Sequence, residues 1–283
     1  MPCVSIITDT DSSLPPDVAD RYHIIQVPIT VQFGQQSLAT GVDIDDAQLF
    51  ARVDREGQLP ATSAPSPGQF ASAYEQALAG GADAIVCICV SSKISGTYNA
   101  AVVASKMFPD RDITVVDSYS VSMGQGFMVL AAAELAAQGA SVEAIVARAQ
   151  DVGRRAHLYG ALATLKYLAM SGRIGYLAAR MANVLNIRPI LTLADGKLEM
   201  LDKVRTRKRA WAKLVELTEA TLGGRPMEKL ALLHVNAREE VLAFGEMLRQ
   251  TVPYAGEPLV CELTPGLSVH TGAGMIGLVV VGT

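Results

Sequence analysis

The amino-acid sequence predicts an α/β protein, in which a doubly wound parallel-sheet domain precedes an α+β domain with a mixed sheet. In the first half of the chain, short apolar runs alternate with helical patterns, which is typical of parallel sheets with right-handed crossovers. In the second half, Asp195-Gly196 separates two strand-like runs, which is a strong hairpin signal. Because 283 residues are long for one domain, we predict two domains, residues 1–156 and 157–283.

The elements of residues 1–156 follow from hydrophobic runs and helix-start signals. Ser66 fits a helix N-cap and Pro67 the first helical position. Prolines on both sides hold Thr62-Ser63 in a stiff, extended loop. The patterns predict strands at residues 4–8, 24–33, 84–90 and 113–117, and helices at residues 45–55, 70–78, 97–107, 125–137 and 141–155.

Residues 157–283 mix a hairpin with single strands and helices. His270 is predicted to lie in a glycine-rich loop. Glycines in residues 272–277 match a dinucleotide-binding pattern, but they precede the last strand and leave no room for a βαβ unit. We expect them to permit close backbone approach instead. The patterns predict strands at residues 157–164, 187–193, 197–204, 229–235, 259–263 and 278–281, and helices at residues 165–170, 176–185, 206–222 and 238–250.

The composition narrows the classes of function. Half of the residues are hydrophobic and only 5% are aromatic, so an internal cavity would have aliphatic walls. A net charge of −4 argues against a broad nucleic-acid surface. The four cysteines form no Cys-x-x-Cys pair, which indicates free thiols in a reducing compartment.

Neither an export signal nor a membrane span is predicted from the sequence. The first residues lack a basic region followed by a long apolar run. The longest apolar run, residues 128–137, contains Glu134 and is too short to cross a bilayer. We therefore predict a cytoplasmic protein without stable membrane insertion.

A hydroxyl-rich turn, residues 91–97, joins the most strand-like run of the chain to a helix. In open α/β sheets, ligands bind outside the carboxyl ends of the strands. A helix N-terminus also offers unpaired N–H groups and the positive end of its dipole. The turn therefore suits a small anion such as a carboxylate or a phosphate, although an ordinary Ser/Thr helix cap would have the same residues.

Two enzymatic hypotheses remain open. Asp9 and Asp11 follow the first strand in an Asp-x-Asp pattern that resembles the haloacid-dehalogenase phosphatases, in which magnesium lies between the aspartates and the phosphate. The downstream lysine and paired acids of such enzymes are missing, and a helix-capping turn accounts for the same residues. Ser95 and His270 could form a hydrolase pair, but the chain has no Gly-x-Ser-x-Gly elbow.

The basic residues gather in one segment, residues 203–209, at a strand end and a helix start. Cations at a helix N-terminus oppose the helix dipole, which favours a role toward a partner or a phosphate. A solvated basic face is the alternative. Arg173 lies between glycine and isoleucine in a predicted turn, where it could hold an anion or simply connect two helices.

Seven segments resemble, in their order and spacing, the DegV family of bacterial fatty-acid-binding proteins. The segments are residues 7–13, 62–66, 91–97, 117–118, 168–175, 186–190 and 270–274, so that the resemblance covers nearly the whole chain. It implies two α/β domains with one long-chain, palmitate-like fatty acid in a tunnel between them. It also implies a lipid carrier rather than an enzyme, with the fatty acid as its ligand and no cofactor.

The same resemblance implies which residues contact the fatty acid. Hydroxyl groups at the positions of Thr62 and Ser95 would hold the carboxylate. Ser63 and Ser92 are neighbours that could contribute, and His270 occupies the position of the family's ligand-side histidine. A buried carboxylate is costly unless it is paired or hydrogen-bonded, and hydroxyl loops can supply the donors without a fixed charge.

Kinase-linked members of the family present the bound acid to an ATP-dependent fatty acid kinase, which makes an acyl phosphate for phospholipid synthesis. By this resemblance Arg173, Arg205 and Arg207 would face such a kinase. Ala64 and Ala273 stand where the family often has glutamine and proline, so contacts to the head group would differ in detail. The acyl tail would gain roughly 0.8 kcal/mol for each methylene buried in an aliphatic cavity.

Overall fold

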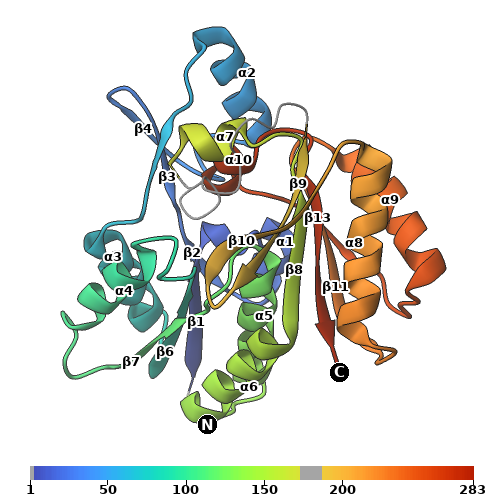
Figure 1. The fold of residues 1–283 in the computed structure, drawn as a ribbon. Coiled ribbons are helices and arrows are strands. Elements are labelled where there is room, and N and C mark those ends of the chain that lie inside the picture. The colour runs from blue at the N-terminus through green and yellow to red at the C-terminus, as the bar shows by residue number, and fades with distance from the viewer. Residues whose placement is uncertain (1–2, 173–186) are drawn as a thin grey trace.

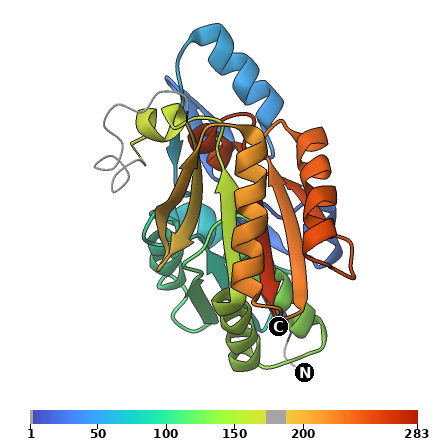
Figure 2. The same cartoon turned by 45° about the vertical axis from the view of Figure 1, so that its right-hand side comes forward.

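The computed structural model describes residues 3–172 and 187–283, which form alternating layers of helix and sheet (Figures 1 and 2). The first part contains, in chain order, β1 (Val4–Asp9), the short 3-10 helix η1 (Thr10–Ser12), α1 (Pro16–Arg21), β2 (Ile25–Val27), β3 (Thr30–Phe33), β4 (Gln36–Ala39), α2 (Asp46–Glu56), β5 (Ala61–Ser63), α3 (Pro67–Ala79), β6 (Ala84–Cys89), α4 (Thr97–Ser105), β7 (Asp112–Asp117), α5 (Met123–Ala137) and α6 (Val142–Arg155). The second part contains β8 (Ala156–Ala161), α7 (Lys166–Met170), β9 (Arg188–Ala194), β10 (Lys197–Val204), α8 (Arg207–Leu222), β11 (Met227–His234), α9 (Arg238–Thr251), β12 (Leu259–Glu262), α10 (Pro265–Thr271) and β13 (Ile276–Gly282).

The first sheet is parallel throughout and has the strand order β2-β1-β6-β7. Successive side chains of a strand point to opposite faces, so β6 serves two layers. Ile85, Cys87 and Cys89 pack beneath α3 and α4, whereas Val86 and Ile88 face α5 and α6. Helices therefore cover both faces, which confirms the doubly wound arrangement expected from the alternating pattern.

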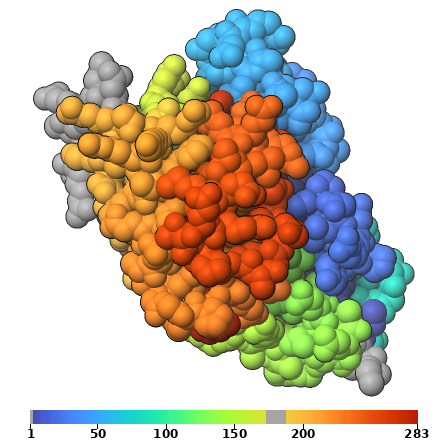
Figure 3. All heavy atoms as spheres, turned by 90° about the vertical axis from the view of Figure 1, so that its right-hand side faces the viewer, coloured from blue at the N-terminus to red at the C-terminus, as the bar shows by residue number. Residues whose placement is uncertain are grey.

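The second sheet is mixed and has the order β10-β9-β8-β13-β11-β12. Only β11 and β12 run parallel, and the other neighbours are antiparallel. Within β13, Val279 and Val281 join the core around α5 and α6, whereas Leu278 and Val280 pack under α8 and α9. Helices α5 and α6 thus lie between the two sheets, and α8 and α9 form much of the surface in Figure 3.

Local signals explain where several helices begin and end. Asp45 and Gln48 form a capping box at the start of α2, and Ser66 and Gln69 form another at the start of α3. Gly57 ends α2 in the left-handed conformation that glycine adopts readily. For these two helices the sequence contains both a cap and an apolar period, and their predicted positions are confirmed.

The predicted single strand at residues 24–33 is wrong. Pro28 cannot donate a backbone hydrogen bond, and the chain divides there into β2 of the parallel sheet and β3 of a separate sheet. This antiparallel sheet has the order β4-β3-β5. The predicted loop at Thr62-Ser63 is likewise wrong, because both residues belong to β5, where they pair with Val31 and Thr30 of β3.

The predicted loop around His270 is also wrong, because His270 lies in α10. This helix starts with Pro265 at its first position and stops at Gly272, whose φ is 79°. It has seven residues, too few to give a clear apolar period in the sequence. The predicted helix at residues 176–185 lies outside the described residues.

Helix α10 lies where several parts of the chain meet, against α2, α7, β3 and η1 (Figure 1). A buried hydrogen bond joins it to α2, because the Ser268 hydroxyl donates to Asp46 Oδ2 at 2.6 Å. The pKa of Asp46 is raised to about 7, mainly by burial and also by the carboxylates of Glu262 and Asp45, whereas the Ser268 bond opposes the shift. The position of α10 therefore depends on a carboxyl group that changes its charge near neutral pH.

One apolar cluster spans residues of both sheets and of α5 and α6. The division of the chain into domains at residue 156 stays a prediction. Within the described ranges, no helix has the length and apolar character required to cross a bilayer.

We expect Asp46 to make the stability of the protein depend on pH. The unfolded chain releases the Asp46 proton near pH 4, whereas the folded protein keeps it until about pH 7. The resulting stabilisation is complete below about pH 4 and is lost as the pH rises through about 7. From about pH 4.5 to pH 8, wild type should lose on the order of 3 kcal/mol of unfolding free energy relative to Asp46→Asn.

Urea denaturation of both proteins across this range measures the difference. Asparagine can still accept the Ser268 bond, so the variant serves as its own structural control. A constant difference between the two proteins would contradict the raised pKa.

Candidate functional site

A pocket of about 460 Å³ opens between the carboxyl edge of the parallel sheet, the three-stranded sheet, α10 and the β9–β10 hairpin. Its volume falls within the range of small-molecule sites, roughly 300–1,000 Å³. The described residues that line it are Asp11, Ile29, Thr62, Ser63, Ala64, Val90, Lys93, Ile94, Ser95, Gly96, Val121, Leu168, Gly172, Leu193, Lys197, Leu198, Gly266, Leu267, His270 and Thr271.

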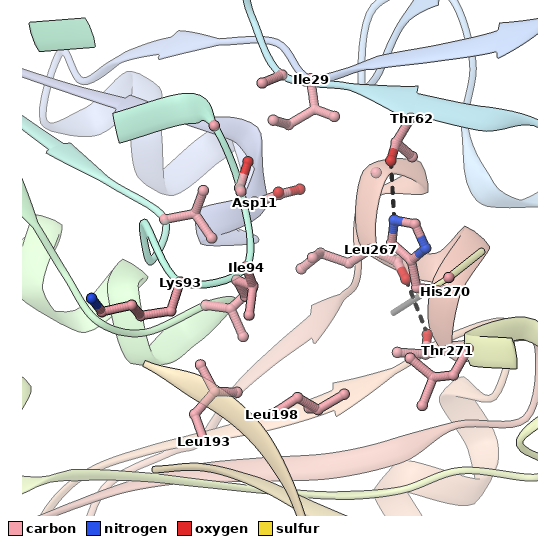
Figure 4. A pocket seen from close by; sticks show the side chains of 18 of the residues that line it. Asp11, Ile29, Thr62, Lys93, Ile94, Leu193, Leu198, Leu267, His270 and Thr271 are labelled. Carbon is pink, nitrogen blue, oxygen red and sulfur yellow. Dashed lines mark hydrogen bonds between the residues drawn. The ribbon is translucent and has the colours of Figure 1, made fainter. Parts of the chain in front are cut away.

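Hydroxyl and imidazole groups gather where β5, α10 and the turn after β6 meet. Thr62 Oγ1 and His270 Nε2 are hydrogen-bonded at 3.1 Å, as Figure 4 shows. Ser95 Oγ and Thr97 Oγ1 are hydrogen-bonded at 2.8 Å at the start of α4. A Cβ atom on Gly96 would lie 3.9 Å from Ala64 Cβ, so the end of β5 and the turn after β6 are close neighbours.

The remainder of the pocket wall is mainly aliphatic. Ile29 comes from the link between β2 and β3, Leu267 from α10, and Leu193 and Leu198 from the β9–β10 hairpin. Figure 4 shows Leu193 and Leu198 on the side of the pocket away from Thr62. A molecule with one polar end and an aliphatic body matches this division.

The structure brings together four of the five residues predicted to bind the ligand. Thr62, Ser63, Ser95 and His270 all line the pocket, although they are up to 208 positions apart in sequence. Ser92 is not among the lining residues, and its backbone N–H donates to Asp117 Oδ1 at 3.2 Å. Their roles toward a ligand stay predictions.

Sequence reasoning did not single out Lys93, Lys197 or Thr271, which also line the pocket. Lys93 lies inside the hydroxyl-rich turn and could have been included with it. No sequence pattern pointed to Lys197 or the hairpin leucines, because only the packing of the second sheet against the first brings them to the pocket. Asp11, which was expected only as part of an Asp-x-Asp phosphatase pattern, is a lining residue as well.

Of the arginines predicted to face a partner, Arg205 and Arg207 are not among the residues that line the pocket. Arg205 is exposed in the bend between β10 and α8. Arg207, at the start of α8, forms an ion pair with Glu240, and its guanidinium lies 5.5 Å from the centre of the Trp211 ring. Arg173 lies outside the described residues.

Asp9 is fully enclosed at the carboxyl end of β1. Its Oδ2 accepts from the backbone N–H of Val90 at 2.8 Å and from the side-chain amide of Gln125 at 3.1 Å. Its Oδ1 accepts from the backbone N–H of Asp11 at 3.0 Å. Burial raises the pKa of Asp9 to about 6, and these hydrogen bonds oppose the shift. The carboxylate thus joins η1, β6 and α5, and offers no open face to a phosphate ester.

The geometry gives little support to the hypothesis that Ser95 and His270 form a hydrolase pair. Ser95 Oγ is hydrogen-bonded to Thr97 and the described bond of His270 Nε2 is to Thr62. A serine hydrolase needs its nucleophile within hydrogen-bond reach of the base. Over residues 3–172 and 187–283, no three His, Cys, Asp or Glu side chains are grouped so as to hold a metal ion.

We expect Asp9→Asn to destabilise the fold, because the amide nitrogen of asparagine would face a backbone N–H donor. An unsatisfied buried donor costs about 1–3 kcal/mol, and urea denaturation at about pH 8 should show a loss of this size. Asp83→Asn is the matched control, since Asp83 accepts one bond from the Cys3 N–H at an exposed position. Magnesium-dependent phosphatase activity that a folded Asp9→Asn protein lacks would instead restore the phosphatase hypothesis.

Comparison with known proteins identifies the family. The sequence model of the DegV family, described as uncharacterised proteins, matches residues 3–283. A DegV domain-containing protein of Streptomyces coelicolor is 36% identical over 277 residues, which cover 98% of both chains. One from Caldanaerobacter subterraneus subsp. tengcongensis is 34% identical over 275 residues and 97% of both chains.

Two solved structures are similar over the full length of this chain. The fatty-acid-binding DegV family protein from Thermus thermophilus is 34% identical, with a TM-score of 0.92 and 100% of both chains covered. DegV from Bacillus subtilis, described as a fatty acid binding protein, is 28% identical, with a TM-score of 0.89 and 100% of both chains covered. By its sequence and its fold, this chain belongs to the DegV family.

Proposed function

We propose that this protein binds one long-chain, palmitate-like fatty acid in the pocket and presents its carboxylate to a fatty acid kinase. The observation that carries the proposal is the division of the pocket into a hydroxyl-rich end and an aliphatic wall. Two relatives of the same fold, from Thermus thermophilus and Bacillus subtilis, are described as binding fatty acid.

The carboxylate is proposed to lie between the end of β5 and the start of α4. Thr62, Ser63 and Ser95 offer hydroxyl donors there, and His270 is held beside them by its bond to Thr62. The N-terminus of α4 adds the positive end of a helix dipole. Hydrogen bonds to an ionised group are stronger than those between neutral groups, so the site can hold a carboxylate without an ion pair.

The acyl tail is proposed to lie along the aliphatic wall. Ile29, Leu267, Leu193 and Leu198 present branched apolar side chains to the pocket. Burial of each methylene contributes roughly 0.8 kcal/mol, so a long chain gains most of its affinity from this wall. The carboxylate then sets orientation more than strength.

The protein is proposed to act as a carrier rather than as an enzyme. A carboxylate held by hydroxyl groups keeps oxygen lone pairs that can attack the γ-phosphorus of ATP supplied by the kinase. The new carboxyl oxygen–phosphorus bond forms as the bond between the β–γ bridging oxygen and the γ-phosphorus breaks, which yields an acyl phosphate and ADP. No cofactor of the carrier is required, and such a partner would be met in the cytoplasm.

The exposed basic residues around Arg205 and Arg207 are proposed to contact the kinase. Positive charge next to a phosphoryl-transfer complex favours association with an acidic partner surface. Arg173 belongs to this proposal through the family resemblance alone.

Native mass spectrometry of the protein purified from cells tests the carrier function first. We expect a one-to-one adduct with the mass of a fatty acid of about 16 carbons, released by organic extraction, because the aliphatic wall retains a long tail. A protein without an adduct that also fails to take up added fatty acid would contradict the proposal.

We expect Thr62→Val with Ser95→Ala to weaken fatty-acid binding. A hydrogen bond to a charged group is worth about 1.5–3 kcal/mol, so each lost hydroxyl should lower the affinity by about tenfold or more. Calorimetric titration with palmitate measures the change in affinity. Ser105→Ala is the control, because Ser105 bonds only its own helix, to the carbonyl of Val102. Unchanged affinity in the double variant would show that the carboxylate lies elsewhere.

We expect Arg205→Glu with Arg207→Glu to slow acyl-phosphate formation by a fatty acid kinase without weakening palmitate binding. Reversing rim charges mainly lowers the association rate of two proteins, so the effect should shrink as salt is added. Lys106→Glu with Arg111→Glu, which reverses two exposed positive charges between α4 and β7, is the charge-matched control. Equal rates for both variants would remove this surface from the proposal.

A further inference from the structure

We propose that the tip of the β9–β10 hairpin is the wall that selects the length of the acyl chain, and that Ser91 positions this wall through Gly196. The inference rests on the fatty-acid binding proposed above. In this inference Ser91, a serine of the hydroxyl-rich turn, contacts the second sheet rather than the ligand.

The hairpin tip extends beyond the sheet to which it belongs. Strand β9 pairs with β8 at Leu191 and Ile190. Two more bonds join them, from the Leu162 N–H to the carbonyl of Pro189 at 3.1 Å and from the Thr192 hydroxyl to the carbonyl of Leu158 at 2.8 Å. Strand β10 is the outer strand of this sheet, with β9 as its neighbour. In the strand ladders of the described residues, residues 193–198 pair with one another, so the tip lies beyond the pairing with β8.

The turn after β6 holds this tip from the other side. The Ser91 hydroxyl donates to the carbonyl of Gly196 at 2.8 Å, and both residues are buried. The same hydroxyl oxygen accepts the backbone N–H of Lys93 at 3.2 Å. This contact connects the carboxyl edge of the parallel sheet to the hairpin of the mixed sheet.

The fit at Gly196 leaves no space for a side chain. Its φ of 75° belongs to the left-handed region. A Cβ atom there would approach Ser91 Oγ to 2.5 Å and Tyr119 Cδ1 to 2.9 Å, which is closer than packed atoms tolerate. A side chain at position 196 would therefore collide with Ser91 and Tyr119 while the tip keeps this position.

The wall is formed by the leucines on either side of the turn. Leu193 and Leu198 line the pocket, on the side away from Thr62 (Figure 4). With the carboxylate held near Thr62 and Ser95, a chain that extends across the pocket meets these leucines. Closely packed protein interiors do not yield freely to one more methylene, and such a wall discriminates by about tenfold or more per methylene.

The test compares affinities for saturated acids of about 12 to 20 carbons. Ser91→Ala removes the positioning bond, and we expect the ratio of affinities between the best acid and its longer neighbours to fall by about threefold or more. Gly196→Ala forces the tip away from Tyr119, so we expect the optimum to move toward longer chains. Asp195→Asn is the matched control: it keeps the same turn, since asparagine also adopts a positive φ, and should leave the ratios unchanged.

Leu198→Ala tests the wall without disturbing the turn. The shortened side chain lengthens the pocket, and the optimum should again move toward longer acids. Hydrogen exchange provides a second readout, because the amides of residues 193–198 should exchange faster in Ser91→Ala than in wild type.

The outcomes separate this inference from the function on which it rests. If wild type takes up none of the acids, the proposed function fails and the inference fails with it. If wild type binds them but Ser91→Ala, Gly196→Ala and Leu198→Ala keep the wild-type ratios, the fatty-acid site stands and the hairpin wall is wrong.

Discussion

The buried carboxylate of Asp9 is the interaction on which the pocket depends. It accepts hydrogen bonds from the backbone of Val90 and Asp11 and from the side chain of Gln125, and it thereby holds β6, η1 and α5 in one arrangement. The turn that carries Ser95 begins immediately after Val90. Burying this carboxylate costs free energy, as its raised pKa indicates. Its two oxygens nevertheless accept hydrogen bonds from several donors, which an apolar side chain at this position could not do.

Around this edge, both halves of the chain contribute to the pocket. The first half offers hydroxyl groups, a helix N-terminus and apolar side chains such as Ile29, Ile94 and Val121. The β9–β10 hairpin and α10 close the pocket with leucines and with His270. Because α5 and α6 pack against both sheets, the two halves share one core. The pocket lies at the seam between them, where a small movement of either half would change its shape.

Much of the binding surface could be anticipated from local residue patterns, and some of it could not. Ser95 and Thr62 stood out because each follows or ends an extended segment near a helix start. Ser92 belongs to the same turn, yet its backbone bonds to Asp117 and it does not line the pocket. Neighbouring side chains in a tight turn point in different directions, so closeness in sequence does not show which of them faces the pocket. Leu193 and Leu198 carried no signal, since alternating apolar residues occur in every half-buried strand.

The sequence by itself determined the parallel sheet, its covering helices and the hairpin at Asp195-Gly196, because periodicity, caps and turn residues act over a few positions. It also contained enough ordered motifs to indicate the family. Only the tertiary structure decided that Pro28 divides one apolar run between two sheets, that His270 lies on a short helix, and that Ser91 reaches the carbonyl of Gly196. These outcomes depend on contacts between residues far apart in the chain, whose energies no local pattern encodes.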